Sequence, residues 1–472
     1  MKNVLVMKFG GTSMGSAERM KIAADICRQQ KATRPVVIVV SAMSKVTDLL
    51  INTLRHAEGG DKAGVETNIE ALRKRHEDTC RELLPPAAQT EAMVGINALI
   101  AEFQRITGGV LMLGERPPRS VDEAIAMGER LSALLIAAFL DSTGIKAKAI
   151  NAATVIVTDA VFGNATPLMD PTREKAQSIL MPLLADDVLP VVTGFNGATA
   201  DGRPTTLGRG GSDFSASILA AALDASELWI WTDVDGIMTA DPRLVKDAVV
   251  LSEVTYSEAA ELAYNGAKVL HPRTLAPLVQ KEIPVWSKNS FNLAAPGTKI
   301  VTTISAPGGA RAVTSMANVA LVSVEPASAE ISGTRVMARA LDALSMVNAE
   351  VLTFSSSSYR QSFCFLVRKE ELSAVTKCLE DGLSLELAHG YLKPIEVDEN
   401  VGLLAIVGEG MRGAAGLAGR IFTAVSREKV NIIAIAQGSS ELTINIVVRR
   451  DDVEKAVKAI HAECRMSELA SF

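Results

Sequence analysis

The sequence predicts an α/β protein: a three-layer sandwich with a mainly parallel sheet, followed by two smaller ferredoxin-like modules. Three observations support this fold class. Short apolar strands alternate with amphipathic helices through residues 1–293, which is typical of a parallel sheet covered by helices. Residues 294–314 contain Pro and Gly, as in a linker. A β-α-β-β-α pattern then occurs twice, over 315–390 and 396–472.

Strands of the first domain are predicted where short runs are rich in Val and Ile or are bounded by turn residues. These runs are Val4–Lys8, Pro35–Met43, Leu189–Phe195, Glu227–Thr232 and Pro284–Lys288. Between the first two strands, apolar residues recur at helical spacing at Met20, Ala23, Ala24 and Cys27. That spacing places them on one face of a helix that packs on the sheet.

The middle of the first domain is predicted to be helical. The stretch from Lys62 to Thr107 is highly charged and helical in character. Ser120 followed by Glu123 matches a capping box, so a helix is expected to begin there and to run to Leu140.

The second half of the chain contains an internal repeat. The first copy is predicted as strand 319–325, helix 333–348, strands 351–354 and 361–367, and helix 371–380. The second copy is predicted as strand 403–407, helix 416–431, strands 432–436 and 442–448, and helix 453–464. An offset of about 83 residues aligns Asn348 with Asn431. Paired modules of this kind more often bind ligands than catalyse reactions.

Composition and charge exclude several classes of protein. Hydrophobic residues make up 48% and charged residues 22% of the 472 residues, as in a globular protein of several domains. Lys+Arg 48 against Asp+Glu 54 gives a net charge of −6, so neither nucleic acid nor a membrane is expected as a partner. No apolar run approaches the ~18 residues of a membrane span, and no signal-peptide core is found. We therefore expect a cytoplasmic protein.

Cysteine and histidine usage argues against several kinds of site. The five cysteines are scattered and lack CxxC spacing, so neither a disulfide framework nor a zinc site is predicted. The five histidines are equally dispersed, which leaves no basis for a Ser-His-Asp arrangement. No protein-bound metal ion is predicted.

A first glycine cluster, KFGGTS at residues 8–13, stands between a predicted strand and a helix. Two adjacent glycines let backbone N–H groups approach a phosphate, and the N-terminus of the next helix adds a favourable dipole. Lys8 precedes the glycines and can neutralise charge on a transferred phosphoryl group. The cluster is not a P-loop, because GxxxxGK[ST] is absent from the sequence. Taken alone, it could equally be a plain turn beside a surface lysine.

Two further clusters follow later strands. LGRGGSD at 207–213 combines backbone donors, a guanidinium suited to carboxylate or phosphate, and a hydroxyl near a helix start. WTDVDG at 231–236 ends a strand, and DPR follows at 241–243. In open parallel sheets, ligands bind at the carboxyl ends of strands, where these loops lie. The aspartates there either orient Mg²⁺-bound phosphates or shape turns.

These clusters belong to a longer set of motifs that resembles one known family, the aspartate kinases of the amino-acid kinase fold. The motifs match in order and are KFGGTS at Lys8, SAMSKVTD at Ser41, GERLS at Gly128, TTLGRGGSD at Thr205, IWTDVDGI at Ile230, TADPR at Thr239 and GAKVLHP at Gly266. The resemblance extends over essentially the whole chain and is closest to the threonine-sensitive, bifunctional branch. It implies the amino-acid kinase fold for 1–293 and ACT modules at 315–390 and 396–472.

The resemblance also implies roles for single residues. Those implied to hold the nucleotide, ATP carrying Mg²⁺, are Lys8, Phe9, Gly10, Gly11, Thr232, Asp233, Arg243, Lys268 and Val269. Those implied to hold L-aspartate are Thr47, Glu129, Arg209 and Ser212. Lys8 and Asp213 are expected to take part in phosphoryl transfer, and Gln437 and Ser439 to contact a regulatory amino acid.

The residue types fit phosphorylation of the β-carboxylate of aspartate to 4-phospho-L-aspartate. That carboxylate, with a pKa of ~3.9, is ionised at pH 7 and needs no general base. The protein must instead hold two anions in line and spread the charge of the transition state. Lys8, the glycine N–H groups and Mg²⁺ would do this, with Asp213 and Asp233 as organisers. Glu129 can pair with the substrate ammonium, and Arg209 with its α-carboxylate.

Three other functions compete with this reading. A kinase of another amino acid, such as glutamate, would resemble only the first part and lack paired ACT modules. A non-catalytic amino-acid sensor would not need Lys8, Arg209 and Asp233 intact. The chain could also be the kinase half of a fusion with homoserine dehydrogenase. No Rossmann domain follows in this chain, so we expect no dehydrogenase activity from it.

The two ACT modules are predicted to differ in ligand binding. In the second, AIAQGSSE at 434–441 resembles the segment of threonine-responsive relatives, whose glutamine contacts the effector. The offset places Phe354 at the matching position of the first copy, where a phenyl ring offers no hydrogen bond and could pack against the other module. We therefore favour threonine over lysine as effector. ACT modules of the family pair across subunits, so a homodimer or larger assembly is expected.

A literal GxGxxG occurs at Gly408–Gly413, between a predicted strand and a helix. A dinucleotide site would need an acidic residue at the end of the next strand, and that strand ends near Gln437. The glycines are expected instead to let a helix start close to a small ligand or a neighbouring chain.

Overall fold

The structure is a computed structural model that describes residues 3–267, 270–304, 309–327, 331–347, 349–358 and 361–471. Its contacts divide the chain into two compact units. The first comprises Met1–Ile237, Ser252–Tyr256 and Leu270–Thr303, and the second comprises Met238–Leu251, Ser257–Val269 and Ile304–Phe472. Two short segments before residue 270 thus belong to the unit that contains the C-terminal repeat. The domain limits inferred from the sequence stay a prediction.

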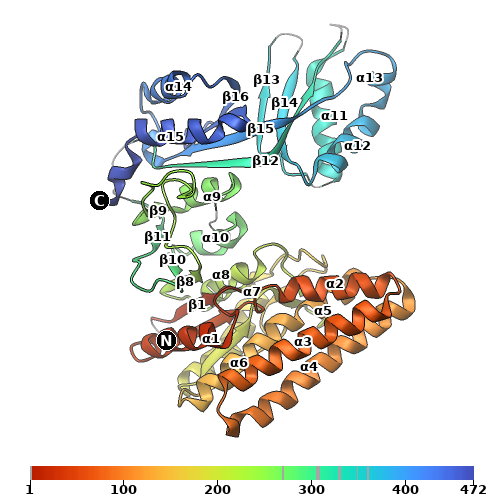
Figure 1. The fold of residues 1–472 in the computed structure, drawn as a ribbon, viewed down its shortest axis with the longest axis vertical. Helices are drawn as coiled ribbons and strands as arrows, with labels where there is room; N and C mark the ends of the chain where they lie inside the picture. The colour runs from red at the N-terminus through yellow and green to blue at the C-terminus, as the bar shows by residue number, and fades with distance from the viewer. Residues whose placement is uncertain are drawn as a thin grey trace. The chain divides into compact units, whose positions relative to one another are not determined.

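The first unit is built on an eight-stranded sheet of order β3-β5-β2-β1-β8-β10-β11-β9 (Figure 1). Its strands are β1 (Leu5–Phe9), β2 (Val36–Val40), β3 (Ala147–Ile150), β5 (Leu189–Thr193), β8 (Glu227–Thr232), β9 (Glu253–Thr255), β10 (Val285–Asn289) and β11 (Thr298–Val301). Neighbouring strands are parallel except β10 and β11. Every residue of β1, β2 and β5 is buried, because both faces of the central sheet are covered. The predicted, mainly parallel sheet is confirmed.

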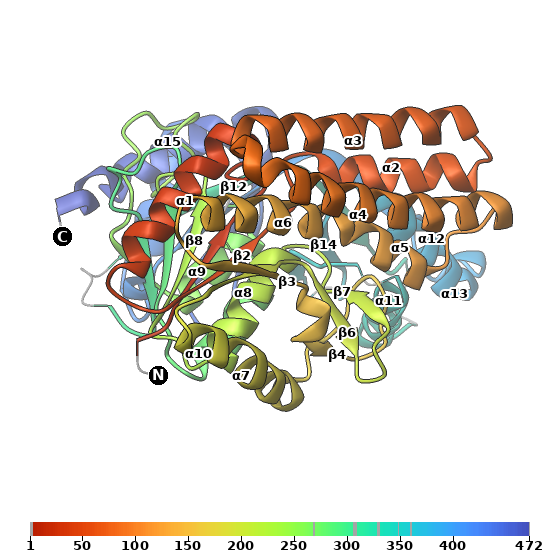
Figure 2. The ribbon, with the colours of Figure 1, turned by 90° about the horizontal axis from the view of Figure 1, so that it is seen from below.

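Helices form a layer on each face of this sheet. They are α1 (Ala17–Lys31), α2 (Val46–Glu58), α3 (Lys62–Leu83), α4 (Pro86–Leu113), α5 (Pro118–Ile125), α6 (Met127–Ser142), α7 (Met169–Ala185), α8 (Gly211–Ala222) and α10 (Pro272–Val279). Figure 2 shows α1, α3, α4 and α6 on one side of the strands and α7, α8 and α10 on the other. A small separate sheet joins β4 (Val157–Thr158), β6 (Asn196–Thr199) and β7 (Pro204–Thr206). Across the described ranges, no helix is both long and apolar enough to span a bilayer.

One local expectation is wrong, and one segment contains a strand that was not expected. The helix expected to begin at Ser120 begins at Pro118 and ends at Ile125, with no side-chain cap. Proline is well suited to the first helical position, because its missing N–H has no partner there in any case. The expected linker 294–314 contains β11, whose buried Thr298 and Ile300 alternate with more exposed neighbours. Pairing with β9 and β10 stabilises this short strand, and the local sequence does not reveal such pairing.

The second unit contains a six-stranded antiparallel sheet of order β13-β14-β12-β15-β17-β16 (Figure 1). The first copy supplies β12 (Ala312–Val324), α11 (Gly333–Met346), β13 (Thr353–Ser356), β14 (Phe363–Arg368), α12 (Leu372–Gly382) and α13 (Ser384–Ala388). The second supplies β15 (Glu396–Val407), α14 (Leu417–Arg427), β16 (Ile432–Gln437), β17 (Thr443–Arg449) and α15 (Val453–Glu463). The first strands of the two copies, β12 and β15, pair in the middle of the sheet. The two copies of the predicted repeat therefore form one continuous sheet.

Helix α9 (Tyr256–Tyr264) is held against this repeat by two carboxylates one turn apart. The buried Glu258 accepts hydrogen bonds from Arg311 Nη1 at 2.8 Å and from the backbone N–H of Glu409 at 2.8 Å. Glu261 accepts one from Thr443 Oγ1 at 2.9 Å. These bonds explain why residues 257–264 belong to the second unit although they precede the repeat by some 50 residues of chain.

Candidate active site

A pocket of about 740 Å³ lies in the first unit, at the carboxyl ends of β1, β2 and β8. Its walls come from the turn after β1, the loop after β2, helices α5 and α6, and the turn that precedes α8. Predicted site residues that line it are Lys8, Gly10, Gly11, Thr47, Glu129, Arg209, Ser212, Asp213 and Thr232. The fold thus gathers parts of all three clusters that the sequence singled out around one cavity.

Of the remaining residues predicted for the nucleotide, Phe9 and Asp233 do not line this pocket. Phe9 is fully buried in the core, and Asp233 is exposed just after β8. Arg243 belongs to the second unit. Lys268 and Val269 lie outside the described residues. Their assignment to the nucleotide therefore stays a prediction.

Lys8 lies near the end of β1 and is 8% exposed. Its Nζ lies 2.5 Å from Oδ1 of Asp213, in the first turn of α8, so the two predicted phosphoryl-transfer residues form an ion pair. A Cβ atom at Gly10 would lie 3.4 Å from that Nζ, and one at Gly11 would lie 3.1 Å from the carbonyl oxygen of Ala42. The two glycines therefore keep the backbone open beside the ammonium group, as a phosphate site requires.

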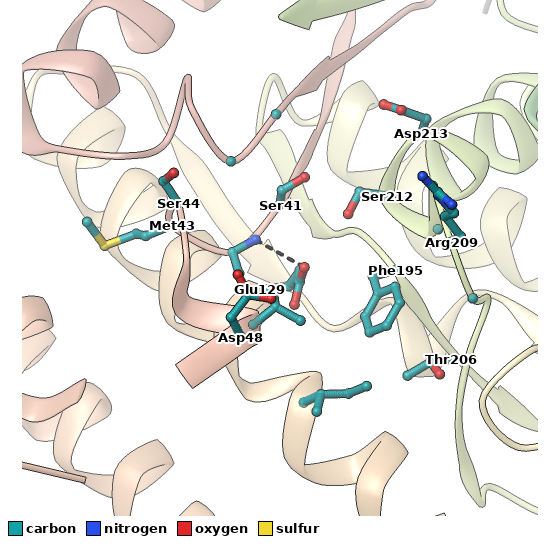
Figure 3. A pocket seen from close by; sticks show the side chains of 18 of the residues that line it. Ser41, Met43, Ser44, Asp48, Glu129, Phe195, Thr206, Arg209, Ser212 and Asp213 are labelled. Carbon is teal, nitrogen blue, oxygen red and sulfur yellow. Dashed lines mark hydrogen bonds between the residues drawn. The ribbon is translucent and has the colours of Figure 1, made fainter. Parts of the chain in front are cut away.

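Arg209 is presented by a turn of two glycines in the left-handed region. Gly208 and Gly210 have φ of 76° and 69°, which side chains other than glycine adopt at a cost. Arg209 is exposed, and no acidic partner for its guanidinium occurs in the described part of the chain. Figure 3 shows Arg209 and Ser212 on one side of the cavity, with Ser41 and Ser44 on the other. The guanidinium is therefore available to an anionic ligand.

Glu129, in the first turn of α6, is a buried carboxylate with one unsatisfied oxygen. It is 3% exposed, and its Oε1 accepts a hydrogen bond from the backbone N–H of Ala42 at 3.1 Å (Figure 3). Within the described ranges its Oε2 has no partner. Burial raises the pKa of Glu129 to about 8, although the Ala42 hydrogen bond and the charge of Lys8 act in the opposite direction. A cation beside Oε2 would supply the missing donor and favour the ionised form.

Several lining residues were not predicted. Ser41, Ala42, Lys45 and Asp48 belong to the SAMSKVTD motif, so their position after β2 was a usable signal. Phe195 gave no such signal. Its φ of 73° is unusual for a bulky residue. Its N–H donates a hydrogen bond to Ser215 Oγ, and its carbonyl oxygen accepts one from the Leu207 N–H, each at 2.9 Å. Asp122 and Thr206, from α5 and β7, were also missed.

A second pocket, of about 670 Å³, lies in the second unit beside the glycine-rich segment that precedes α14. Gln437 and Ser439 line it together with residues of 411–419, Gly438, Glu441 and Ile444. Gly416, just before the helix, has a φ of 83°. The structure thus brings both predicted effector residues to one cavity, next to the end of the GxGxxG segment.

The corresponding position of the first copy is filled differently. Phe354 stacks on Phe363 with ring centroids 5.6 Å apart and packs against the core of its own module. The expectation that it packs against the other module stays a prediction. Strands β13 and β16 stand at opposite ends of the strand order, but their residues approach each other, and Leu352 and Ile433 belong to one apolar cluster of the two modules.

Within the described residues, no group of three or more His, Cys, Asp or Glu side chains is placed to hold a metal ion.

Comparison with known proteins identifies the family. Residues 3–289 match the amino acid kinase family model, and residues 404–464 match an ACT domain model. Lysine-sensitive aspartokinase 3 of Escherichia coli (strain K12) is 32% identical over 467 residues, which cover 98% of this chain and 99% of that protein. The chain belongs to the aspartokinase family. The resemblance inferred from the motifs is thereby confirmed.

A solved structure and a bifunctional relative are also informative. A crystal structure of E. coli aspartokinase III in complex with aspartate and ADP matches with a TM-score of 0.83 and 31% identity, covering 98% of this chain and 99% of that one. Bifunctional aspartokinase/homoserine dehydrogenase 1, chloroplastic, of Arabidopsis thaliana is 35% identical over 471 residues. These cover 98% of this chain and 51% of that protein, so the chain spans about half the length of such relatives.

Proposed function

We propose that the chain phosphorylates the β-carboxylate of L-aspartate with ATP, and that a regulatory amino acid controls the reaction. The observation that carries this proposal is a pair of recognition groups in one pocket. Among the described residues, the buried carboxylate of Glu129 has one oxygen without a donor, and the guanidinium of Arg209 has no acidic partner. Together they match the ammonium and the α-carboxylate of an amino acid. The E. coli relative whose structure holds aspartate and ADP supports the same substrates.

Recognition of an α-amino acid distinguishes this pocket from one for a simple diacid. The substrate ammonium would donate to Oε2 of Glu129, and the α-carboxylate would accept two parallel hydrogen bonds from Arg209. Thr47 and Ser212 line the same cavity and would bind the substrate through their hydroxyl groups. Anchored at this end, the substrate can direct its β-carboxylate toward Lys8 and the two glycines.

Phosphoryl transfer requires no base from the protein. An oxygen of the ionised β-carboxylate attacks the γ-phosphorus, the bond from that phosphorus to the β–γ bridging oxygen breaks, and ADP leaves. Lys8 and the backbone N–H groups of Gly10 and Gly11 would stabilise the charge on the transferred group. Asp213 orients Lys8 through their ion pair. Mg²⁺ would arrive with ATP as part of the substrate and neutralise charge on its phosphates.

The other nucleotide contacts remain proposals that depend on the motifs. Thr232 lines the pocket and Asp233 follows it at the end of β8. Phe9, Arg243, Lys268 and Val269 are assigned to ATP on the family resemblance alone. The cytoplasmic location and a role in the synthesis of lysine, threonine and methionine likewise stay predictions.

The test is an assay of ADP release with purified chain, MgATP and aspartate. We expect ADP formation that depends on aspartate, with a product that reacts with hydroxylamine as an acyl phosphate does. Glutamate and N-acetylglutamate serve as controls and should give little turnover. ADP formation with glutamate and none with aspartate would replace this proposal by a glutamate-type kinase. No turnover with either amino acid, combined with binding of an amino acid to the second unit, would favour a non-catalytic sensor.

For regulation, we propose that threonine is the effector and that it binds in the second pocket, which gives one effector site per chain. The amide of Gln437 and the hydroxyl of Ser439 can hydrogen-bond the polar groups of an amino acid, whereas Phe354 at the matching position cannot. The E. coli relative is named lysine-sensitive, so lysine is the competing effector. Adding threonine or lysine to the aspartate assay distinguishes them.

A homodimer or larger assembly, formed through the ACT modules, completes the proposal. Light scattering after gel filtration measures the assembly size directly. A monomer at micromolar concentration would contradict it.

A further inference from the structure

Asp122 on α5 is a second buried carboxylate in the lining of the pocket. It is 1% exposed, and three donors surround it. Its Oδ2 accepts hydrogen bonds from the backbone N–H of Gly163 at 2.8 Å and of Thr206 at 2.9 Å. Its Oδ1 accepts one from Thr206 Oγ1 at 2.7 Å. Unlike Glu129, Asp122 therefore has a protein donor on each oxygen.

The three donors belong to two loops that meet beside Arg209. Thr206 ends β7 and stands three residues before Arg209. Gly163 lies under the same turn, because a Cβ atom at Gly208 would lie 3.3 Å from the Gly163 carbonyl oxygen and 2.5 Å from Asn164 Oδ1. Figure 3 shows Thr206 and Arg209 along the same side of the cavity. One carboxylate thus ties α5 to both loops that shape this wall.

Arg209 itself has little else to fix it. Its side chain is exposed and has no ion-pair partner within the described residues, and both of its neighbours are glycines. Its direction must come from the backbone of the turn. Among the described residues, the Asp122 contacts to Thr206 hold this segment together with three other interactions. These are the hydrogen bond from the Ala165 N–H to the Thr206 carbonyl oxygen at 2.8 Å, the pairing of Thr206 with Asn196, and the hydrogen bond from the Leu207 N–H to the Phe195 carbonyl oxygen.

We propose that Asp122 is a positioning residue for aspartate recognition: through Thr206 and Gly163 it sets the location of Arg209 relative to Glu129. The inference rests on the proposed function. Each oxygen of Asp122 already accepts from a protein donor, so we assign Asp122 to positioning and not to direct contact with the substrate. Its negative charge is needed because all three surrounding groups donate, and charged acceptors form the stronger hydrogen bonds.

Asparagine at this position would be nearly isosteric but chemically wrong. With its amide nitrogen toward the two backbone N–H groups, asparagine would repel the Gly163 loop and the 206–209 segment. With that nitrogen toward Thr206, the hydroxyl would have to accept instead of donate, and all three hydrogen bonds would lose their anionic acceptor. A displacement of the recognition group should weaken binding of aspartate more than it changes the chemical step, since Lys8 and Asp213 lie on other elements. A general structural role would instead lower stability and affect both substrates alike.

The experiment measures KM for aspartate, KM for ATP and kcat for the wild type and four variants. Asp122→Asn should raise KM for aspartate about 10-fold or more, with KM for ATP and kcat changed less than about threefold. Thr206→Val, which loses only the hydroxyl donor, should show a smaller increase, and Thr206→Ser should restore the wild-type value. Glu123→Gln, at the neighbouring and partly exposed position, is the matched control.

A pH profile separates the role of Asp122 from that of Glu129. In wild type, KM for aspartate should fall as pH rises toward 8, because Glu129 becomes ionised. Asp122→Asn should shift this curve upward by a constant factor and keep its shape. Equal increases in both KM values, or a lower melting temperature with unchanged KM values, would overturn the positioning role. A wild-type chain that does not phosphorylate aspartate would overturn the proposed function as well, whereas an active wild type with unaffected variants would overturn only this inference.

Discussion

The two pockets are built from the same local device but carry different charges. In each, glycines at positive φ lead into a helix: Gly208 and Gly210 before α8, and Gly413 and Gly416 before α14. Such turns expose backbone N–H groups at a helix N-terminus and favour an anionic group of a ligand. On backbone geometry alone, neither pocket would be recognised as the catalytic one.

Buried charge separates them. The first pocket holds Lys8, Asp122 and Glu129, each less than 10% exposed. The second has a single ionisable lining residue, Glu441, which is exposed and accepts a hydrogen bond from the Gly413 N–H at 2.7 Å. Burying charges destabilises a fold unless they are paired, so we expect the buried charges of this pocket to serve a function. Stabilising a transition state and recognising a charged substrate are such functions, whereas reversible binding of an effector needs only neutral donors and acceptors.

Removing the buried cation should have the largest effect. Lys8→Ala should lower kcat by ~10²–10³-fold and change KM for ATP much less, because the ammonium charge matches the charge that develops during transfer. Steady-state kinetics with saturating aspartate measures this. Lys31→Ala, which removes a lysine paired with Asp187 on the surface, is the control. A Lys8 variant with near wild-type kcat would remove Lys8 from the mechanism.

Neutralising the buried acid should have the next largest effect. Glu129→Gln should raise KM for aspartate by about 10- to 100-fold, as expected for loss of a charged hydrogen bond. With a pKa of about 8, wild-type Glu129 is mostly protonated at pH 7, so aspartate binding should release a proton. Calorimetry in buffers of different ionisation enthalpy detects that proton. A wild-type KM that does not change between pH 6 and 8 would contradict this account.

The same substitution also tests stability. The pKa of Glu129 is higher in the folded chain than its ordinary value of 4.5, so the folded state binds the proton more tightly. Wild-type stability should therefore decline as pH rises from about 4.5 to 8. Glu129→Gln has no titratable carboxyl at this position and should not lose stability in this way. Its melting temperature should therefore exceed that of wild type at pH 8 and approach it near pH 4.5.

Substituting the exposed Arg209 should have a smaller effect, and one confined to the binding of aspartate. Arg209→Lys should raise KM for aspartate by about tenfold with KM for ATP little changed, since a point ammonium cannot reproduce two parallel hydrogen bonds. Arg203→Lys, which retains a surface pair with Asp201 in a nearby loop, is the matched control. If KM for ATP rose instead, Arg209 would be reassigned to the phosphates.

The smallest effect is expected in the second pocket, where no buried charge is lost. Gln437→Ala should weaken threonine binding by roughly 3- to 10-fold, the cost of one neutral hydrogen bond. Titration calorimetry on wild type should show one site per chain, and Phe354→Leu should leave its affinity unchanged. Two equal sites in wild type, or lysine binding with threonine silent, would refute the proposed difference between the modules.

How far the sequence could predict the fold depended on how each strand is buried. Strand β8 coincides with the predicted Glu227–Thr232, and β1 differs from its prediction by one residue at each end. Strands in the middle of a parallel sheet are apolar throughout because both faces of the sheet are covered, and such apolar runs are easily recognised in the sequence. The short strands β9 and β11 were missed. They are three and four residues long and are held by partners outside their own segment.

The motifs of the sequence by themselves determined the family and the chemistry-bearing residues Lys8, Glu129 and Arg209, because strand-end glycines and charged residues at fixed spacing are local features. Only the tertiary structure decided the burial, the pKa and the partners of these residues. The pKa of Glu129 depends on burial and on Ala42, 87 residues away, and the Lys8–Asp213 pair joins the end of β1 to the first turn of α8. Asp122 reaches its donor Thr206 across 84 residues. The protonation, burial and hydrogen bonding of a side chain depend on residues that are distant in the sequence and close only in the folded chain. A local sequence pattern therefore cannot predict them.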